Sequence, residues 1–279
     1  MNIDYIGLDE FLLSALKEDV GTGDITTNCC IPAENRSEAY FLAKEDGVIC
    51  GIDIAQRIFS LVDERITVIP QMKDGDSVKK GDIIAEVIGP SRGILTGERV
   101  ALNLMQRLSG TASATAKAVS SVDGTNAKIA DTRKSTPGLR VLEKYAVRVG
   151  GGHNHRFNLS DGVLIKDNHI AAAGGIASAI KAARATVPHV MKIEVETETL
   201  DEVSQALEAG ADIIMLDNMS LDMMTQAVSL INGKAITEAS GNMGEKDLSE
   251  VAKTGVDYIS IGALTHSVKS LDISLKFKK

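Results

Sequence analysis

Residues 192–217 read KIEVETETLDEVSQALEAGADIIMLD, and this stretch decides the fold class. It begins and ends with a short apolar strand, and the segment between them has the pattern of a helix. Thr199 and Glu202 have the spacing of a capping box at the start of that helix, and Gly210 is placed to end it. A strand, a helix and a second strand at this spacing indicate a parallel βαβ unit.

The same alternation continues on both sides of this stretch. The last four apolar strands recur every 21 to 23 residues, and polar residues follow six strand ends: KIADTRK, VLIKDNH, MKIEVE, DIIMLDN, AITEAS and DYISIGA. An open doubly wound sheet and a (β/α) barrel both fit this pattern. The dinucleotide fingerprint G-x-G-x-x-G is absent, and functional groups at the carboxyl ends of several strands are typical of a barrel. We therefore predict a barrel.

The first hundred residues have a different pattern. Residues 8–19 have helical spacing, and residues 37–62 predict a strand, a turn, a second strand and a helix. Residues 66–95 predict short strands, and their V-x-x-G-D pattern resembles the hairpins of biotinyl-type and lipoyl-type barrel-sandwich domains. A long helix is predicted over 97–122. The chain is thus expected to contain two different architectures.

Composition limits the classes of partner. Thirty Lys and Arg stand against 38 Asp and Glu, giving a net charge of −8, which argues against nonspecific binding to nucleic acid. No apolar run approaches the roughly 18 residues of a membrane span, and the N-terminus lacks the pattern of a signal peptide. The cysteines Cys29, Cys30 and Cys50 have no zinc-type spacing. We predict reduced thiols in a cytoplasmic protein with no nucleic-acid or membrane partner.

Charged side chains are expected to point inward at one rim of the barrel. Because side chains alternate along a strand, Glu194 and Glu196 share one face, and Asp217 and Lys166 stand at corresponding strand ends. Uncompensated buried charge is costly, so several charges on one rim indicate a ligand.

The charges indicate what that ligand is. Carboxylates or phosphates suit four cations near the rim, Arg133, Lys134, Arg156 and Lys166. The carboxylates Glu196 and Asp217 suit hydroxyl groups or a hard divalent metal such as Mg²⁺. Small residues in EASGNMG and SIGALTHS expose backbone N–H groups at helix starts, as in the phosphate sites of barrels. These residues predict group transfer on a sugar phosphate with a carboxylated partner.

Several longer motifs occur in order along nearly the whole chain. They are EDVGTGDITT (18–27), GERVALNLMQRLSGTAS (97–113), DTRKSTPGLR (131–140), KYAVRVGGGHNHRFNLSDGVLIKDNH (144–169), IEVET, IMLDN, EASGN and SIGALTHS. In this order they resemble the quinolinate phosphoribosyltransferase family, also called nicotinate-nucleotide pyrophosphorylase (carboxylating or decarboxylating).

The resemblance implies an α/β fold with an N-terminal α/β sandwich, similar to a barrel-sandwich, over 1–108. It also implies an incomplete (β/α) barrel over 109–268, followed by a C-terminal segment over 269–279 that returns to the first domain. It also implies a homodimer or a hexamer with an active site shared between chains. The implied reaction joins quinolinate to phosphoribosyl pyrophosphate with Mg²⁺ and gives nicotinate mononucleotide, pyrophosphate and CO₂, a step of NAD biosynthesis.

The resemblance also assigns roles to individual residues. The implied catalytic residues are Lys134, Lys166, Glu196 and Asp217, the last two also taking the ribose hydroxyls and the metal ion. The implied quinolinate site consists of Thr132, Arg133, His155, Arg156, Lys166 and, from the neighbouring chain, Arg99. Lys134 would face the pyrophosphate, and the implied 5-phosphate cradle consists of Ser240, Gly241, Asn242, Ile261, Gly262, Ala263 and His266.

Three other functions stay open at this point. A relative of the same fold, of the type associated with molybdenum-uptake operons, would act on a different acceptor. A Schiff-base aldolase would use Lys166 as its nucleophile, which requires a buried lysine. A carrier module without enzymatic activity would be modified on Lys73, next to the turn at Asp74-Gly75.

Overall fold

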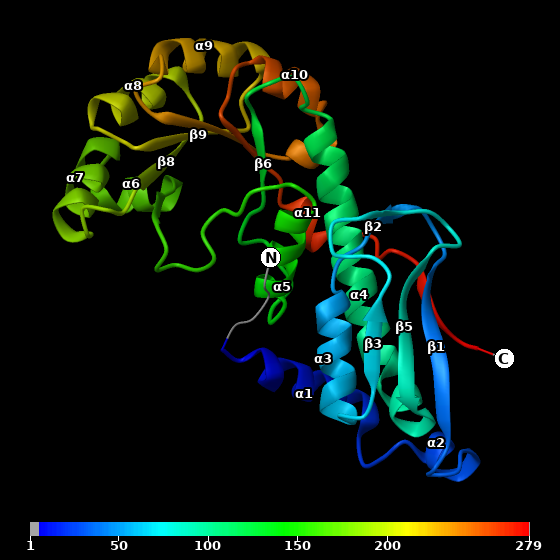
Figure 1. Cartoon of the computed structure of the whole chain (residues 1–279). Helices are drawn as coiled ribbons and strands as arrows, with labels where there is room; N and C mark the ends of the chain where they lie inside the picture. Colours follow the sequence, from blue (N-terminus) through cyan, green and yellow to red (C-terminus); the bar gives the residue numbers. More distant parts are fainter. Residues whose placement is uncertain (1–5, 279) are drawn as a thin grey trace. The chain divides into compact units, whose positions relative to one another are not determined.

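The computed structural model describes residues 6–278, and these form two compact units (Figure 1). The first unit consists of the described residues within Met1–Ala116, Pro137–Gly151 and Val268–Lys279. The second consists of Lys117–Thr136 and Gly152–Ser267. The expected limits 1–108, 109–268 and 269–279 stay a prediction, since the units described here reflect packing and are not continuous in sequence.

The first unit is built on a four-stranded antiparallel sheet of order β12-β1-β5-β3. Its strands are β1 (Arg36–Ala43), β3 (Thr67–Pro70), β5 (Ile83–Pro90) and β12 (Ile273–Phe277), and a small ladder joins β2 (Gly47–Val48) to β4 (Ser77–Val78). Its helices are α1 (Leu8–Val20), α2 (Ile25–Cys30), α3 (Ile52–Val62), most of α4 (Ser91–Ser120) and α5 (Arg140–Val149). The strands and helices expected over 8–19 and 37–62 are confirmed, and the long helix begins at Ser91 rather than near residue 97.

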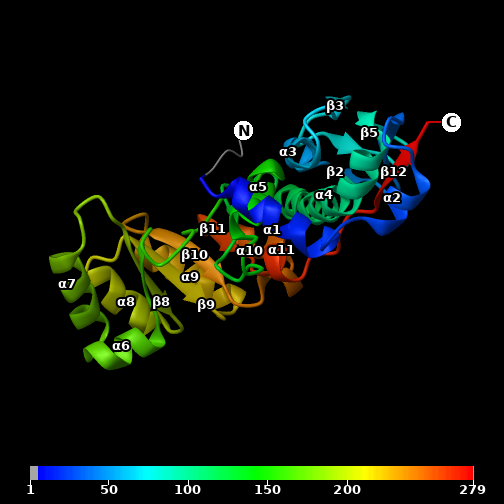
Figure 2. The ribbon, with the colours of Figure 1, turned by 90° about the horizontal axis from the view of Figure 1, so that it is seen from below.

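The C-terminal segment belongs to the first unit. Strand β12 pairs antiparallel with β1, with Ala39 opposite Phe277 and Ala43 opposite Ile273. Figure 2 shows β12 among the N-terminal strands. Leu271, Ile273 and Leu275 are buried in the same hydrophobic core as Phe41. The last strand is therefore a structural part of the unit that the chain begins with.

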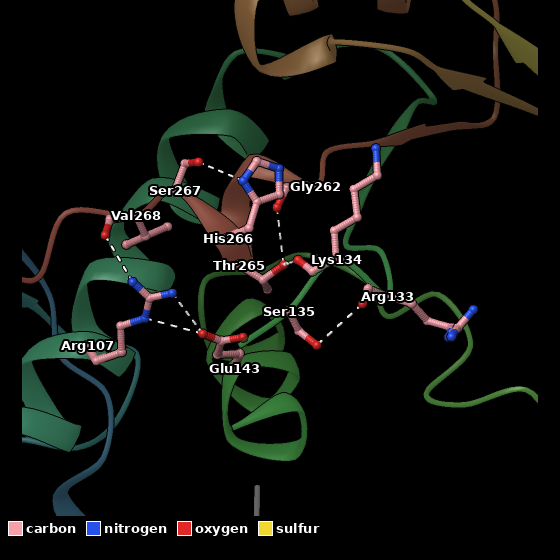
Figure 3. A network of polar contacts seen from close by, with 10 residues as sticks. All are labelled: Arg107, Arg133, Lys134, Ser135, Glu143, Gly262, Thr265, His266, Ser267 and Val268. Carbon is pink, nitrogen blue, oxygen red and sulfur yellow. Dashed lines mark hydrogen bonds and ion pairs between the residues drawn. The ribbon is translucent and has the colours of Figure 1, made fainter. Parts of the chain in front are cut away.

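A buried ion pair joins three separate segments of the first unit (Figure 3). Arg107 on α4 donates from Nη2 to Glu143 Oε1 on α5 at 2.8 Å, and its Nη1 donates to the carbonyl of Val268 at 3.1 Å. Glu143 is completely buried, so the guanidinium supplies the charge that makes its burial tolerable. The pair explains why α5 packs with this unit although it follows a strand of the other.

The second unit is a curved parallel sheet of six strands in the order β6-β11-β10-β9-β8-β7. The strands are β6 (Lys128–Ala130), β7 (Val163–Ile165), β8 (Ile193–Thr197), β9 (Ile213–Asp217), β10 (Ile236–Ser240) and β11 (Tyr258–Ser260). The helices α6 (Asp167–Ala173), α7 (Ile176–Thr186), α8 (Leu200–Glu208), α9 (Leu221–Ile231) and α10 (Leu248–Lys253) lie along its outer side in Figure 1, and η1 (Met243–Glu245) and α11 (Ala263–His266) follow β10 and β11. All six predicted strands are present in one sheet, which confirms the incomplete barrel.

The signals that set the helix starts are seen in the side-chain contacts. Thr199 Oγ1 accepts a hydrogen bond from the Glu202 N–H, and the Glu202 carboxylate accepts one from the Thr199 N–H, so the predicted capping box is confirmed. Ser220 caps α9, because its Oγ accepts a hydrogen bond from the Met223 N–H. These caps satisfy backbone groups that the first turn of a helix leaves unpaired, and they fix where each strand ends.

Within residues 6–278, no helix has the length and apolar character that crossing a membrane requires. The location of the protein in the cytoplasm stays a prediction. Cys29 and Cys30 are exposed on α2, Cys50 is buried, and all three are free thiols.

Candidate active site

A cavity of about 480 Å³ opens at the carboxyl ends of the parallel strands of the second unit. It brings together eleven of the predicted site residues: Thr132, Arg133, Lys134, His155, Arg156, Lys166, Glu196, Asp217, Ser240, Gly241 and Asn242. Leu164, Met215, Asn218, Glu238 and Ser260 complete the lining. The expectation that charged side chains from several strands point to one rim is therefore confirmed.

Lys166 and Glu196 form an ion pair in this cavity, between the ends of β7 and β8. The backbone N–H of Lys166 donates to His169 Nδ1 at 3.0 Å, which fixes the turn from β7 into α6. Asp217, at the end of β9, accepts a hydrogen bond from Asn218 Nδ2 at 2.7 Å. Each charged group thus has a neighbour that limits its rotation.

Arg156 is held in a position that has an electrostatic cost. Its Nη1 donates to the Gly162 carbonyl at 2.8 Å, while its buried Nε has no hydrogen-bond partner among the described residues. Burial of the guanidinium and, next, the charge of Arg133 lower the pKa of Arg156. A bound anion would relieve both effects, because it would supply the missing acceptor and offset the repulsion.

The loop that follows β6 is fixed by hydroxyl groups (Figure 3). Thr132 Oγ1 accepts a hydrogen bond from the Lys134 N–H at 3.0 Å, and Thr265 Oγ1 lies 2.6 Å from the Lys134 carbonyl and donates to it. The Lys134 side chain passes over Gly262, where an added Cβ would lie 3.2 Å from Lys134 Cδ. These contacts direct the ammonium group from the loop into the site.

The turn after β10 needs a glycine at position 241. Gly241 has φ +94°, and an added Cβ would lie 2.2 Å from Asn218 Oδ1. Ser240 and Asn242 flank it on the cavity wall. Ile261, Gly262, Ala263 and His266 are not among the lining residues, although they lie directly after β11, and His266 Nδ1 is 2.6 Å from Ser267 Oγ. Their part in a phosphate site stays a prediction.

Arg99 lies on α4 in the first unit, with an exposed side chain whose Nη2 is 3.9 Å from Glu98 Oε1. Its expected reach into a neighbouring chain's site stays a prediction.

Sequence reasoning did not identify a buried polar cluster in the barrel interior. His155 Nε2 lies 3.0 Å from Glu194 Oε2 and 3.7 Å from Glu238 Oε1. Burial and then the charge of Glu194 raise the pKa of Glu238 to about 7. Glutamates at alternate strand positions were the available signal, since Glu194 shares its inward face with Glu196.

A second cavity of about 490 Å³ lies on the other side of this cluster. It is lined by residues that begin strands, among them Val163, Ile213 and Tyr258, and by Glu194. His155, Arg156 and Glu238 line both cavities. The cluster therefore separates the carboxyl end of the barrel interior from its amino end.

Comparison with known proteins places this arrangement in a family. Residues 24–109 match the model for the quinolinate phosphoribosyl transferase N-terminal domain, and residues 111–276 match that for the C-terminal domain. The hairpin beside Lys73 therefore belongs to that N-terminal domain, and the carrier-module hypothesis is wrong.

Individual relatives agree over nearly the whole chain. A Bacillus subtilis protein named probable nicotinate-nucleotide pyrophosphorylase [carboxylating] is 50% identical over 273 residues, covering 98% of this chain and 94% of its own. A Nicotiana glauca protein named quinolinate phosphoribosyltransferase [decarboxylating] 2, mitochondrial, is 46% identical over 96% of this chain and 82% of its own. The crystal structure of NadC from Streptococcus pyogenes superposes with a TM-score of 0.92 at 47% identity, covering 99% of both chains. The chain is a member of the quinolinate phosphoribosyltransferase family.

Proposed function

We propose that this chain transfers the phosphoribosyl group of phosphoribosyl pyrophosphate to quinolinate, with loss of CO₂. The products are nicotinate mononucleotide, pyrophosphate and CO₂, in NAD biosynthesis. The observation that carries the proposal is the placing of Arg133, Arg156 and Lys166 on one cavity wall with the carboxylates Glu196 and Asp217. A dicarboxylate acceptor and a sugar phosphate together supply charges complementary to this wall.

The cations hold the acceptor. Arg133 and Arg156 offer forked N–H donors that match a carboxylate, and the unpartnered Nε of Arg156 is available to an acceptor atom. Lys166 supplies a further positive charge, and Thr132 borders the same wall. His155 contributes position rather than charge, because its ring nitrogens are occupied within the protein. With both carboxylates held, the pyridine nitrogen can be aimed at C1 of the ribose.

The carboxylates assist the transfer. As pyrophosphate leaves C1, positive charge develops on the ribose, and Glu196 and Asp217 are placed to stabilise it and to accept from the ribose hydroxyls. Bond formation to the pyridine nitrogen then gives that ring a positive charge. When CO₂ departs, the electron pair left on the adjacent ring carbon is stabilised by this cationic nitrogen and by the ammonium of Lys166. That carbon then takes up a proton, which gives nicotinate mononucleotide.

The phosphates are held by the loops after β6, β10 and β11. Lys134 faces the pyrophosphate. Because pyrophosphate departs as an anion, the ammonium group of Lys134 stabilises it. The 5-phosphate lies in the cradle of Ser240, Gly241, Asn242, Ile261, Gly262, Ala263 and His266. Backbone N–H groups in turns made of small residues bind phosphate without needing a basic protein surface.

The donor set of Glu196 and Asp217 suits Mg²⁺, which prefers one or two carboxylates together with substrate phosphates. Bound there with the pyrophosphate, Mg²⁺ would supply charge neutralisation of the leaving group. Glu196 already pairs with Lys166. This pairing fits the arrangement, because the Glu196 carboxylate can bind Mg²⁺ as a second cation.

We further propose that the active protein is a homodimer, or a hexamer, in which Arg99 of one chain completes the quinolinate site of another. The exposed side chain of Arg99 supports this proposal, since it has no buried partner that would prevent such a reach.

Two other enzymatic functions are less well supported. Lys166 is half exposed and paired with Glu196, so it lacks the burial that activates a Schiff-base nucleophile. A relative acting on a different acceptor would be expected to change the wall that Arg133 and Arg156 form, and both are present here.

The test offers the purified protein phosphoribosyl pyrophosphate and Mg²⁺ with quinolinate, and in a parallel reaction with nicotinate. Nicotinate mononucleotide formed from quinolinate alone, followed by chromatography, is the expected result, with one CO₂ released for each product. Product from nicotinate at a comparable rate, or from neither acid, would overturn the proposed acceptor. Omission of Mg²⁺ with excess chelator is expected to abolish turnover.

A further inference from the structure

The imidazole of His155 is held on both sides by the protein itself. Its Nδ1 accepts a hydrogen bond from the backbone N–H of Arg156 at 2.8 Å. A ring nitrogen that accepts carries no proton, so the ring proton lies on the opposite nitrogen, Nε2. Nε2 then donates to Glu194 Oε2 at 3.0 Å. The two contacts together specify one tautomer.

The acceptor for this proton is set deep in the barrel. Glu194 is 4% exposed and Glu238, on the next strand but one, is 5% exposed. Glu194 Oε1 and Glu238 Oε1 have no hydrogen-bond partner among the described residues. Two buried carboxylates are expensive for a fold, so a contact made by one of them has a reason beyond packing.

A metal ion is the first alternative reason. The potential ligand atoms of His155, Glu194 and Glu238 all lie within 4.8 Å of one another. A metal ion on Nε2 would require that nitrogen to be unprotonated while Nδ1 also uses its lone pair to accept from Arg156. The ring would then be an imidazolate, which the two buried carboxylates disfavour. The contacts fit a hydrogen-bond chain and not a metal centre.

The chain of hydrogen bonds leads to Arg156. Asp131, completely buried at the end of β6, accepts from the His155 N–H at 2.9 Å and from Asn154 Nδ2 at 2.6 Å. The backbone of His155 is thus fixed by Asp131, its ring by Glu194, and the backbone of Arg156 by that ring. Among residues 6–278, the hydrogen bond that fixes the Arg156 guanidinium is the one from Nη1 to the Gly162 carbonyl.

We propose that Glu194 is a positioning residue: by accepting from His155 Nε2 it holds the imidazole that fixes Arg156 against the substrate cavity. The proposal rests on the proposed function, because Arg156 is assigned there to the acceptor. Glu194 does not touch the reacting atoms. Its effect is expected on the binding of the carboxylated acceptor and not on that of the phosphoribosyl donor.

Two substitutions separate positioning from general packing. In Glu194→Gln the amide oxygen still accepts from Nε2, whereas Glu194→Leu removes the acceptor at similar volume. We expect Glu194→Leu to raise KM for quinolinate about tenfold or more with KM for phosphoribosyl pyrophosphate within about twofold, and Glu194→Gln to stay within about threefold for both. Melting temperature is measured for each, because replacing a buried carboxylate by leucine is often neutral or stabilising. Glu208→Leu, at an exposed position on α8, is the control.

A spectroscopic readout tests the hydrogen-bond chain without turnover. In protein labelled with ¹⁵N-histidine, the His155 signals, assigned by their loss in His155→Gln, are expected to show a protonated Nε2 and an unprotonated Nδ1. Glu194→Leu is expected to speed exchange of the Nε2 proton with water, and Glu194→Ala serves for the same measurement if the leucine variant is not recovered folded.

The outcomes are distinct. A protonated Nδ1 in the wild-type protein, or equal KM values for quinolinate in Glu194→Leu and Glu194→Gln, would overturn the positioning role. A parallel rise of both KM values together with a lower melting temperature would also overturn it, since that is the result of a packing defect. Wild-type protein without activity on quinolinate would overturn the proposed function, while the tautomer would still report whether the chain of hydrogen bonds exists.

Discussion

The guanidinium of Arg156 is partly buried beside that of Arg133, and its removal tests the acceptor site directly. We expect Arg156→Ala to weaken quinolinate binding by about 2–4 kcal/mol, because a charge-assisted contact in a partly buried site is lost. Steady-state kinetics would show this as a higher KM for quinolinate. Arg65→Ala, which removes an exposed ion pair with Asp63, is the control. Unchanged kinetics in Arg156→Ala would remove this residue from the site.

Lys134 provides the complementary measurement on the donor side. Its ammonium is directed by the contacts of its backbone with Thr132 and Thr265. We expect Lys134→Ala to raise KM for phosphoribosyl pyrophosphate more than KM for quinolinate, since the leaving pyrophosphate loses a cation. The reverse pattern would mean that the roles of Lys134 and the arginines are exchanged.

The raised pKa of Glu238 predicts a pH dependence of stability. Burial, and next the charge of Glu194, raise this pKa from 4.5 to about 7, so the folded state binds the proton more tightly than the unfolded state. The resulting stability is fully present below pH 4.5 and is lost as pH rises through 7. Glu238→Gln lacks this dependence, so its melting temperature relative to wild type is expected to increase between about pH 5 and pH 8. A constant difference across this range would contradict the assignment.

At the residue scale, strand alternation predicted which charges point inward. Glu196, Asp217 and Lys166 were found this way because each stands at a strand end and shares a face with the residue two positions before it, which is Glu194, Met215 and Leu164 respectively. Asp131 and Glu238 were not predicted as site residues, because their role comes from contacts with His155, which lies on a loop distant in sequence. A carboxylate that accepts from another segment's backbone leaves no local pattern.

The turn between β10 and η1 allows a test at the scale of a structural element. Gly241→Ala is expected to lower activity with a higher KM for phosphoribosyl pyrophosphate, because the Cβ would collide with Asn218 and the residue would be strained by about 1–3 kcal/mol. Gly210→Ala carries a similar positive φ, +81°, with nothing within 4 Å of the added Cβ. This control is expected to lose stability but not to change KM. Equal kinetic effects of the two substitutions would refute a specific role of the turn.

Elements with strong end signals were predictable, and elements defined by distant packing were not. Helix α8 has a side-chain cap and an apolar face, so sequence located its start. Helix α5 was not predicted, because its buried face includes Glu143 and Lys144, which a hydropathy pattern assigns to the surface. The Glu143 contact with Arg107 on α4 explains that burial, and it joins residues 36 positions apart.

At the scale of the whole molecule, the chain leaves and re-enters each unit. The first unit takes three segments and the second takes two. The family resemblance supplied the architecture of a parallel-sheet domain and a separate antiparallel-sheet domain, which the structure confirms, while the predicted limits of the domains and of the final return stay a prediction. The passage of residues 137–151 into the first unit could not be read from local sequence, since it depends on which helix α5 packs against.

The proposed sharing of the site between chains is tested by mixing two inactive variants. Arg99→Ala and Arg156→Ala are each expected to have low activity. After subunit exchange, mixed dimers contain one site with both arginines intact, so up to about a quarter of the wild-type activity is expected to return if exchange is complete and random. Light scattering before and after mixing checks the oligomeric state. No recovery despite proven exchange would place both arginines in the same chain's site or remove Arg99 from it.

The pairing of β12 with β1 also has a consequence for protein synthesis. On the ribosome β1 emerges early and β5 soon afterwards, so one side of β1 can be paired while translation continues. The other side must wait for residues 273–277, which are translated only after the whole second unit. Throughout that interval the nascent chain exposes an unpaired strand edge, the kind of surface that pairs wrongly with other chains. The sheet of the first unit is therefore completed only after the second unit has been translated.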